Sequence, residues 1–189
     1  MALTARIRPH FLFNSLNAVL GVIRDDPRRA ERALEELSDL FRVLMRDNRE
    51  LVTVSDEIEL CRQYLALEDL RLGARLAVRW QIDCPLDARV PPLMLQPLVE
   101  NAVYHGIEPR DVPGEVGIRL SQDADQLVVQ VRNPVDRARL PVHGNRMALA
   151  NIRERLMLFF DLEASLECDE TERDYIVTLR MPLRTGATA

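Results

Sequence analysis

The sequence predicts an α+β protein in two parts, a helical hairpin that pairs with a second copy of itself and a sandwich of helices on a sheet. Apolar residues recur at three- and four-residue spacing along residues 5–24 and 27–47, which indicates two helices. The stretch Asp25-Asp26-Pro27 between them supplies a turn, an N-cap and a proline suited to the first helical position. Residues 53–189 instead mix helical patterns with short runs of period two, so we place the domain boundary between 1–52 and 53–189.

Composition excludes several classes of protein. With 189 residues, of which 47% are hydrophobic, the chain can bury one good core or two small ones. The net charge of −5 and the lack of a basic stripe argue against direct binding of nucleic acid. All 25 basic residues are arginine, which excludes a lysine nucleophile and a lysine-based phosphate loop. The three cysteines have neither metal-type nor disulfide spacing, and no apolar run is long enough to cross a membrane, so we expect no membrane contact by this segment.

The first helix carries one narrow polar stripe on an otherwise apolar surface. The stripe consists of His10, Asn14, Asn17, Gly21 and Arg24. A helix that is apolar nearly all round must be buried on several sides, and one hairpin cannot cover that much surface. The simplest solution is a four-helix bundle formed by two antiparallel hairpins, with the polar stripe facing outward.

His10 has three interpretations: a core histidine bonded to a neighbour, a metal ligand, or an exposed imidazole that does chemistry. A metal site is disfavoured because no second His, Cys or carboxylate lies one turn away on the same face. Asn14, which does lie there, is a poor ligand for a transition metal. The position of His10 on the polar stripe favours the exposed, functional imidazole.

The second part reads as an α+β sandwich, with a sheet on one side and helices on the other. Ser55, followed by acidic residues, is the expected N-cap of a helix that runs to about residue 72. Residues 134–145 have no apolar period and are expected to form a mobile loop. The other expected elements are antiparallel strands at 76–82, 114–121, 126–133, 164–169 and 174–181, and helices at 91–107 and 146–160.

A polar cluster follows the apolar run "MLQPLV". It consists of Glu100, Asn101, Tyr104 and His105. These residues could form a solvated helix end that closes at Gly106. A carboxamide beside a carboxylate, with a histidine one turn on, could equally hold magnesium and polyphosphate oxygens. Spacing alone favours neither interpretation.

Four motifs, in this order, carry a family resemblance: "RPHFLFNSLN", "YLALEDLRLGARL", "PPLMLQPLVENAVYHGI" and "NIRERL". They resemble the LytS/AlgZ-type sensor histidine kinases over nearly the whole chain, with the alginate-regulatory AlgZ/FimS sensors as the closest likeness. The resemblance implies that residues 1–52 are the dimerisation hairpin. It implies that residues 53–189 form an ATP-binding sandwich of the type shared by gyrase and histidine kinases (GHKL).

The resemblance also assigns roles on the hairpin and on the polar cluster. His10 would be the phosphoacceptor. Apart from the resemblance, Asn14 lies one turn along the same polar stripe, where we expect it to orient a water or the phosphoryl group of a regulator. Asn101 would bind magnesium, Glu100 would accept a proton, and His105 would lie against the nucleotide.

The remaining implied contacts to ATP include several departures from the family pattern. Asn133 stands where the family has the aspartate that accepts from the adenine amino group, and a carboxamide gives that bond without charge assistance. Gly144 remains from the lid motif, but Arg146 replaces its second glycine, and Tyr104 replaces a lysine. Further along, Asn151, Arg153 and Arg155 match the family's "N-x-R-x-R" helix, of which the first two would contact nucleotide.

The function that the resemblance implies is a two-component histidine kinase that uses ATP and Mg²⁺ to phosphorylate His10. A response regulator, of the DNA-binding LytTR type, would then receive the phosphoryl group. Members of the family carry membrane helices upstream, so the resemblance implies the cytoplasmic segment of an inner-membrane protein. The altered adenine and lid motifs keep a second hypothesis open, a non-catalytic dimeric scaffold that binds the regulator. A hydrolytic ATPase fits less well, since it leaves the His10 stripe without a role.

Overall fold

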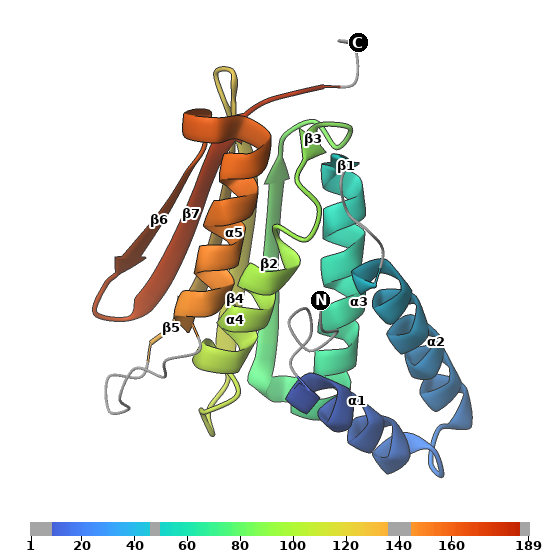
Figure 1. Ribbon diagram of the computed structural model, residues 1–189. Coiled ribbons are helices and arrows are strands. Elements are labelled where there is room, and N and C mark those ends of the chain that lie inside the picture. Colours follow the sequence, from blue (N-terminus) through green and yellow to red (C-terminus); the bar gives the residue numbers. More distant parts are fainter. Residues whose placement is uncertain (1–8, 46–49, 136–144, 186–189) are drawn as a thin grey trace.

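The computed structural model describes residues 9–45, 50–135 and 145–185 of the chain. Two layers make up the larger part, a five-stranded sheet and three helices, α3, α4 and α5, that cover one of its faces (Figure 1). Helices α1 and α2 lie beyond α3 and both pack against it (Figure 1). The predicted combination of a helical hairpin and a helix-on-sheet sandwich is therefore confirmed.

The hairpin consists of α1 (Pro9–Val22) and α2 (Pro27–Leu44). Asp26 caps α2 as expected, because its side chain accepts a hydrogen bond from the backbone N–H of Arg29 at 3.0 Å. The buried face of α2 follows the three- and four-residue spacing of the sequence, with Ala30, Ala33, Leu37, Leu40 and Leu44. These side chains join the same hydrophobic core as the second part of the chain.

Helix α3 (Val54–Leu72) begins two residues earlier than expected, because its N-cap is Thr53. The prediction of Ser55 as N-cap is wrong, because Thr53 and Asp56 form a reciprocal capping box with bonds of 3.1 and 3.0 Å. Thr53 is held in the extended conformation by a short antiparallel pairing of β1 (Val52–Thr53) with β3 (Arg89–Val90). Two-residue strands show no periodicity, so the sequence did not indicate them.

The sheet has the order β2-β4-β5-β7-β6. Its strands are β2 (Leu76–Asp83), β4 (Gly114–Asp123), β5 (Gln126–Pro134), β6 (Ser165–Glu170) and β7 (Asp174–Pro182). The strands after β2 pair antiparallel as predicted, whereas β2 pairs parallel to β4. The sheet is therefore mixed, because the chain crosses over through α4 between these two strands.

Helix α4 (Gln96–Gly106) is shorter than predicted, and α5 spans Asn145–Phe160. The expectation of a helix from residue 91 is wrong, because residues 91–95 form a buried loop in which Leu93 has a left-handed φ of 54°. Pro91 and Pro92 disfavour a helix there. Two short 3-10 helices, η2 (Gly73–Arg75) and η3 (Asp161–Glu163), follow α3 and α5.

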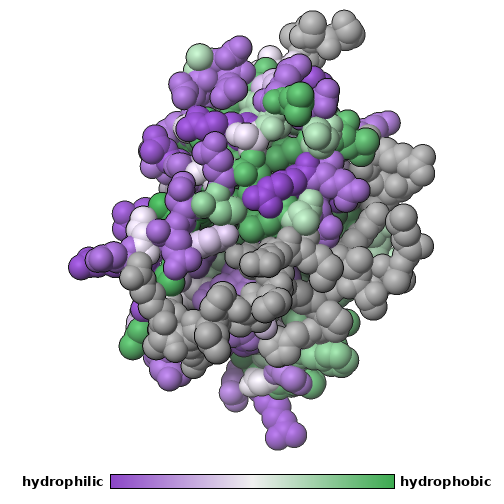
Figure 2. Space-filling model, turned by 60° about the vertical axis from the view of Figure 1, so that its left-hand side comes forward, coloured by the Kyte–Doolittle hydropathy of each residue, from purple (hydrophilic) through white to green (hydrophobic). Residues whose placement is uncertain are grey.

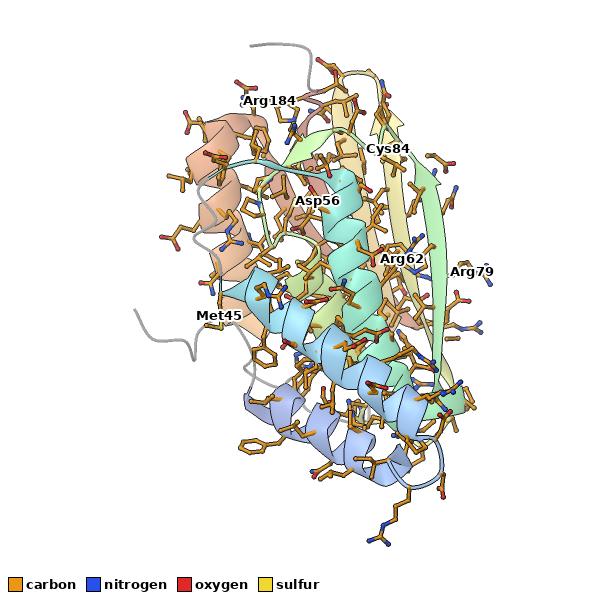
Figure 3. All side chains as sticks on the ribbon, turned by 90° about the vertical axis from the view of Figure 1, so that its right-hand side faces the viewer. Met45, Asp56, Arg62, Arg79, Cys84 and Arg184 are labelled. Carbon is orange, nitrogen blue, oxygen red and sulfur yellow. The ribbon has the colours of Figure 1, made fainter. Side chains whose placement is uncertain are left out.

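The two faces of the sheet differ in chemistry. On the face that the helices cover, Arg62 of α3 lies over the ring of Trp80 of β2, with 5.7 Å between its guanidinium carbon and the ring centroid. Figure 3 labels Arg62 on α3. On the other face, a line of ion pairs crosses four strands through Arg79, Glu115, Arg132 and Asp174. No helix in the described part of the chain has the length and hydropathy needed to cross a bilayer.

Candidate functional site

Helix α4 carries the predicted polar cluster into the interior. The Asn101 side chain is buried, with 7% of its surface exposed, and Glu100 is half-buried and accepts a hydrogen bond from Gln96 Nε2 at 3.1 Å. The rings of Tyr104 and His105 meet edge to face at 4.8 Å. A buried asparagine argues against the interpretation of this cluster as a solvated helix end.

Asn133 lies at the end of β5 and touches the end of α4. A Cβ atom at Gly106 would come within 2.6 Å of Asn133 Cβ, so only glycine lets the helix approach the strand this closely. The buried carboxamide of Asn133 donates to the backbone oxygen of Pro134 at 3.1 Å. The fold therefore brings together the residue expected to read adenine and the helix expected to bind magnesium.

Helix α5 contributes the other expected contacts. Asn151 and Arg153 are exposed, whereas Arg155 is half-buried and points to the loop before α4. Its Nη1 atom donates to the backbone oxygens of Pro92 and Leu93. Three hydrophobic residues of α5 and η3 are exposed, Met157, Leu158 and Leu162. Figure 2 shows the side of the molecule that faces left in Figure 1, where hydrophobic residues gather between hydrophilic ones.

Several predicted features lie wholly or partly outside the described residues. The His10 backbone belongs to the first turn of α1, but its side chain is not described. Of the loop expected over 134–145, residues 136–144, which include Gly144, are not described, whereas Pro134 ends β5 and Asn145 begins α5. The side chain of Arg146 is not described either. Asn14 lies on α1 and is half-buried.

Phe11, the neighbour of His10, connects α1 to α3. Its buried ring contacts Tyr64 of α3, with ring centroids 5.0 Å apart and planes tilted by 37°. Burial raises the pKa of Tyr64, and the negative charges of Glu68 and then Glu100 raise it further. Tyr64 therefore ties the start of α1 to α3, which itself packs against α4, the helix of the polar cluster.

A buried ionic network continues from Tyr64 along α3. Glu68 is buried on that helix, and Arg71 donates to its carboxylate at 2.5 and 3.1 Å. The same arginine donates to Glu108, just after α4, at 3.0 Å. Burial raises the pKa of Glu68, and the charge of Arg71 counteracts this effect. The network ties α3 to the end of α4.

Glu57 is a buried residue that sequence reasoning did not single out. Its carboxylate accepts hydrogen bonds from the backbone N–H groups of Leu93, Met94 and Leu95, at 2.6, 2.9 and 2.8 Å. Burial raises its pKa, against the opposing effects of these three bonds and of the Arg155 charge. Since Asp56 and Glu59 flank it, the sequence suggested only a helix start. Its position four and seven residues before the apolar Cys61 and Tyr64 was the signal that it faces the core.

Comparison with known sequences gives the family. The family model described as "Histidine kinase" matches residues 1–76. The chain is 32% identical, over 99% of its length, to Sensor histidine kinase YpdA of Escherichia coli strain K12, of which the match covers 35%. It is 30% identical, over 97% of its length, to Sensor protein LytS of Staphylococcus haemolyticus, of which 34% is covered. The chain thus spans about a third of the length of these curated relatives.

Solved structures confirm the fold. The catalytic domain of histidine kinase ThkA superposes with a TM-score of 0.52 at 16% identity, over 70% of this chain and 94% of that one. A crystal structure of ThkA in complex with the response regulator protein TrrA matches with a TM-score of 0.51 at 14% identity, over 95% of this chain and 60% of that one. The likeness to alginate-regulatory sensors stays a prediction. The sequence comparisons support a LytS-type sensor histidine kinase, of whose length this chain spans about a third.

Proposed function

We propose that this segment is a two-component histidine kinase that phosphorylates His10 with ATP and passes the phosphoryl group to an aspartate of a response regulator. The nucleotide lies between α4, the end of β5 and α5, within reach of Asn101, His105, Asn133 and Asn151. Gly144 and Arg153 complete this set of expected contacts from the lid and from α5. Residues 1–52 act as the dimerisation and phosphoacceptor domain, and residues 53–189 act as the ATP-binding domain.

The observation that carries the proposal is the contact of Phe11 with Tyr64. This contact anchors the start of α1 on α3, beside the helix that carries Glu100 and Asn101. The phosphoacceptor histidine directly precedes Phe11 in the chain. An anchored acceptor helix replaces a bimolecular encounter with a positioned one, which is the main contribution of a protein to phosphoryl transfer.

The chemistry is an in-line displacement at the γ-phosphorus of ATP. A neutral imidazole nitrogen of His10 forms the new P–N bond with its lone pair, while the P–O bond to ADP breaks and ADP leaves with that electron pair. Neutral imidazole is available at pH 7, because its unperturbed pKa is about 6.5. The imidazole loses its ring proton, and Glu100, a half-buried carboxylate beside Asn101, is the candidate acceptor of that proton.

The donor set on α4 fits a magnesium ion held mainly by phosphate oxygens. The ion prefers oxygen ligands and commonly uses one or two protein ligands beside substrate phosphates. Asn101 offers one carboxamide oxygen on α4, and the described residues include no group of three or more His, Cys, Asp or Glu that could hold a metal alone. The ion would neutralise charge on the phosphates, and Asn101 would position it.

We propose that this kinase binds nucleotide weakly. Asn133 would accept from the adenine amino group through its neutral carboxamide oxygen, without charge assistance. Asn133→Asp should tighten ATP binding, whereas Asn101→Ala should weaken it, and calorimetry measures both. Equal affinity for ATP in the parent and in Asn133→Asp would contradict the assigned role of Asn133.

Homodimerisation completes the proposal. Helices α1 and α2 expose apolar side chains that one chain leaves uncovered, namely Phe13, Leu16, Leu20, Ile23, Leu34 and Met45. A hollow of about 510 Å³, lined by Ile23 of the turn and by residues of α2 that include Leu34, lies on this surface. A second hairpin would cover it and form a four-helix bundle. The regulator, of LytTR type, would dock near the polar stripe, where Asn14 orients its phosphoryl group.

Labelling with ATP tests the function directly. The parent protein, incubated with γ-labelled ATP and magnesium, should take up label that acid removes and alkali preserves, as expected for phosphohistidine. His10→Gln should fold and dimerise but take up none. A folded parent that takes up no label, yet binds its regulator as a dimer, would favour the scaffold, an alternative that the replaced adenine aspartate supports. Label that persists in His10→Gln would contradict the assignment of the phosphoacceptor.

A further inference from the structure

We infer that Glu57 and Arg155 act as a pair of positioning residues that clamp the loop before α4 from both sides. The clamp fixes α4 and α5 to each other and thereby sets the distance between Asn101 and Asn151. The inference rests on the proposed function, since it assigns these two asparagines to one nucleotide. Neither Glu57 nor Arg155 contacts the nucleotide in this account.

Glu57 holds the amide side of the loop. One carboxylate oxygen accepts from Leu93 N–H at 2.6 Å, and the other accepts from Met94 and Leu95 N–H at 2.9 and 2.8 Å. Leu95 directly precedes α4, which lacks a side-chain cap of its own, so these bonds fix the loop up to the first residue of that helix. Three amide donors compensate much of the cost of burying the carboxylate.

Arg155 holds the carbonyl side of the same loop. Its Nη1 atom donates to the oxygens of Pro92 and Leu93, the latter at 3.0 Å. The Arg155 charge also acts on Glu57 and lowers its pKa, against the larger effect of burial. In the peptide unit between Pro92 and Leu93, the N–H is therefore bound by Glu57 of α3 and the C=O is bound by Arg155 of α5.

The backbone of the loop indicates that it is held under strain. Leu93 has a φ of 54°, in the left-handed region that side chains with a Cβ atom rarely adopt, and it is buried. Such a conformation persists only where its surroundings impose it. If the clamp is removed, the loop is free to relax, and α4 can shift relative to α5 although the sheet beneath both remains intact.

The matched variants lie on the same two helices. Arg155→Lys keeps the positive charge but loses the planar group that reaches two carbonyls, and Glu57→Gln keeps the shape of its side chain but removes the second acceptor oxygen. Glu154→Gln and Glu59→Gln change exposed carboxylates on α5 and α3 and serve as controls. If Glu57→Gln does not fold, Arg155→Lys alone still tests the clamp.

Two measurements on each variant separate positioning from general stability. Calorimetry gives the affinity for ADP with magnesium, and amide hydrogen exchange gives the opening of the loop, of α4, and of β4 and β5. We expect Arg155→Lys to melt cooperatively, to bind ADP about tenfold to a hundredfold more weakly, and to exchange faster in residues 93–106 alone. The two control variants should match the parent in both measurements.

A folded Arg155→Lys protein overturns the inference if its ADP affinity stays within twofold of the parent. Unchanged exchange in α4, or exchange that accelerates equally in β4 and β5, overturns it as well, because the residue would then serve no local role. A parent that binds no ADP contradicts the proposed function instead. The exchange pattern of α4 would still decide whether the clamp exists.

Discussion

The helical hairpin and the sandwich differ most clearly at their two helical glycines. Gly21 of α1 has open space where a side chain would lie, with no atom within 4 Å of an added Cβ. Gly106 of α4 has Asn133 directly against it, at a distance that excludes any side chain. The sandwich is tightly packed around Asn133, whereas the hairpin leaves apolar side chains exposed. Under the proposed function, the sandwich needs fixed geometry and the hairpin needs a surface for a partner.

The largest expected effect tests how the hairpin is anchored. Phe11→Ala should cost about 3–5 kcal/mol of the stability of α1 on α3, because a buried aromatic ring is lost from its contact with Tyr64. Thermal melts followed by circular dichroism measure this loss. The control is Leu162→Ala, since Leu162 is 84% exposed and lies in η3, outside the hairpin. A Phe11→Ala protein as stable as the Leu162→Ala control would show that the anchor is unimportant.

The next effect concerns the apolar surface of the hairpin. Leu20→Glu should convert a dimer into a monomer with folded helices, since a charge in the seam costs about 2 kcal/mol or more of association free energy. Leu20 is 64% exposed in the single chain. Sedimentation velocity measures the change. Leu158→Glu, at an exposed position of α5, should leave the dimer intact, and a parent that sediments as a monomer at micromolar concentration would refute the bundle.

The two glycines give a paired prediction of opposite sign. Gly106→Ala should cost about 1–3 kcal/mol, because the new methyl group forces α4 away from β5. Gly21→Ala should instead raise stability by about 0.5–1 kcal/mol, since alanine favours the helix and meets no obstacle. Urea unfolding of both variants measures the two changes. Equal effects at the two sites would remove the contrast between a closed and an open region.

The smallest effect depends on pH and lies where the two regions meet. Burial raises the pKa of Glu36 on α2 from its usual value of 4.5, and the charge of Glu59 on α3 raises it further, against Arg32. The stability from this group is therefore complete below about pH 4.5 and is lost as pH rises through the folded pKa. Glu36→Gln should raise the Tm at pH 7 by about 1 °C and by less at pH 5. A Tm difference that grows toward low pH would contradict this sign.

Local patterns predicted most of the fold, and the misses have physical causes. The three- and four-residue spacing found α1, α2, α3 and α5, since a helix repeats its buried face within a few residues. The run at 91–95 was misassigned because a buried loop and a buried helix are equally apolar. Its conformation depends on Glu57 and Arg155, which are distant in sequence. The parallel pairing of β2 with β4 likewise depends on a crossover that no local pattern encodes.

The residues of the candidate site were likewise predicted only where a local pattern marked them. Glu100 and Asn101 were found as a polar group in an apolar run, but only the family resemblance connected them to Asn133, because strand and helix meet in space and not in sequence. Glu57 was hidden among acidic residues of a helix start. Its role became visible once three backbone amides were seen to converge on it.

The most direct test of the account is the position of the phosphoryl group after incubation with ATP and magnesium. An arginine-specific protease separates the three histidines, with His10 in residues 7–24, His105 in 90–110 and His143 in 140–146, because the Arg8–Pro9 bond resists cleavage. Mass spectrometry at alkaline pH should find one added phosphoryl group on the peptide of residues 7–24, at His10. A phosphoryl group on either of the other two peptides, or on Ser15 of the first, would contradict the central claim that His10 is the phosphoacceptor.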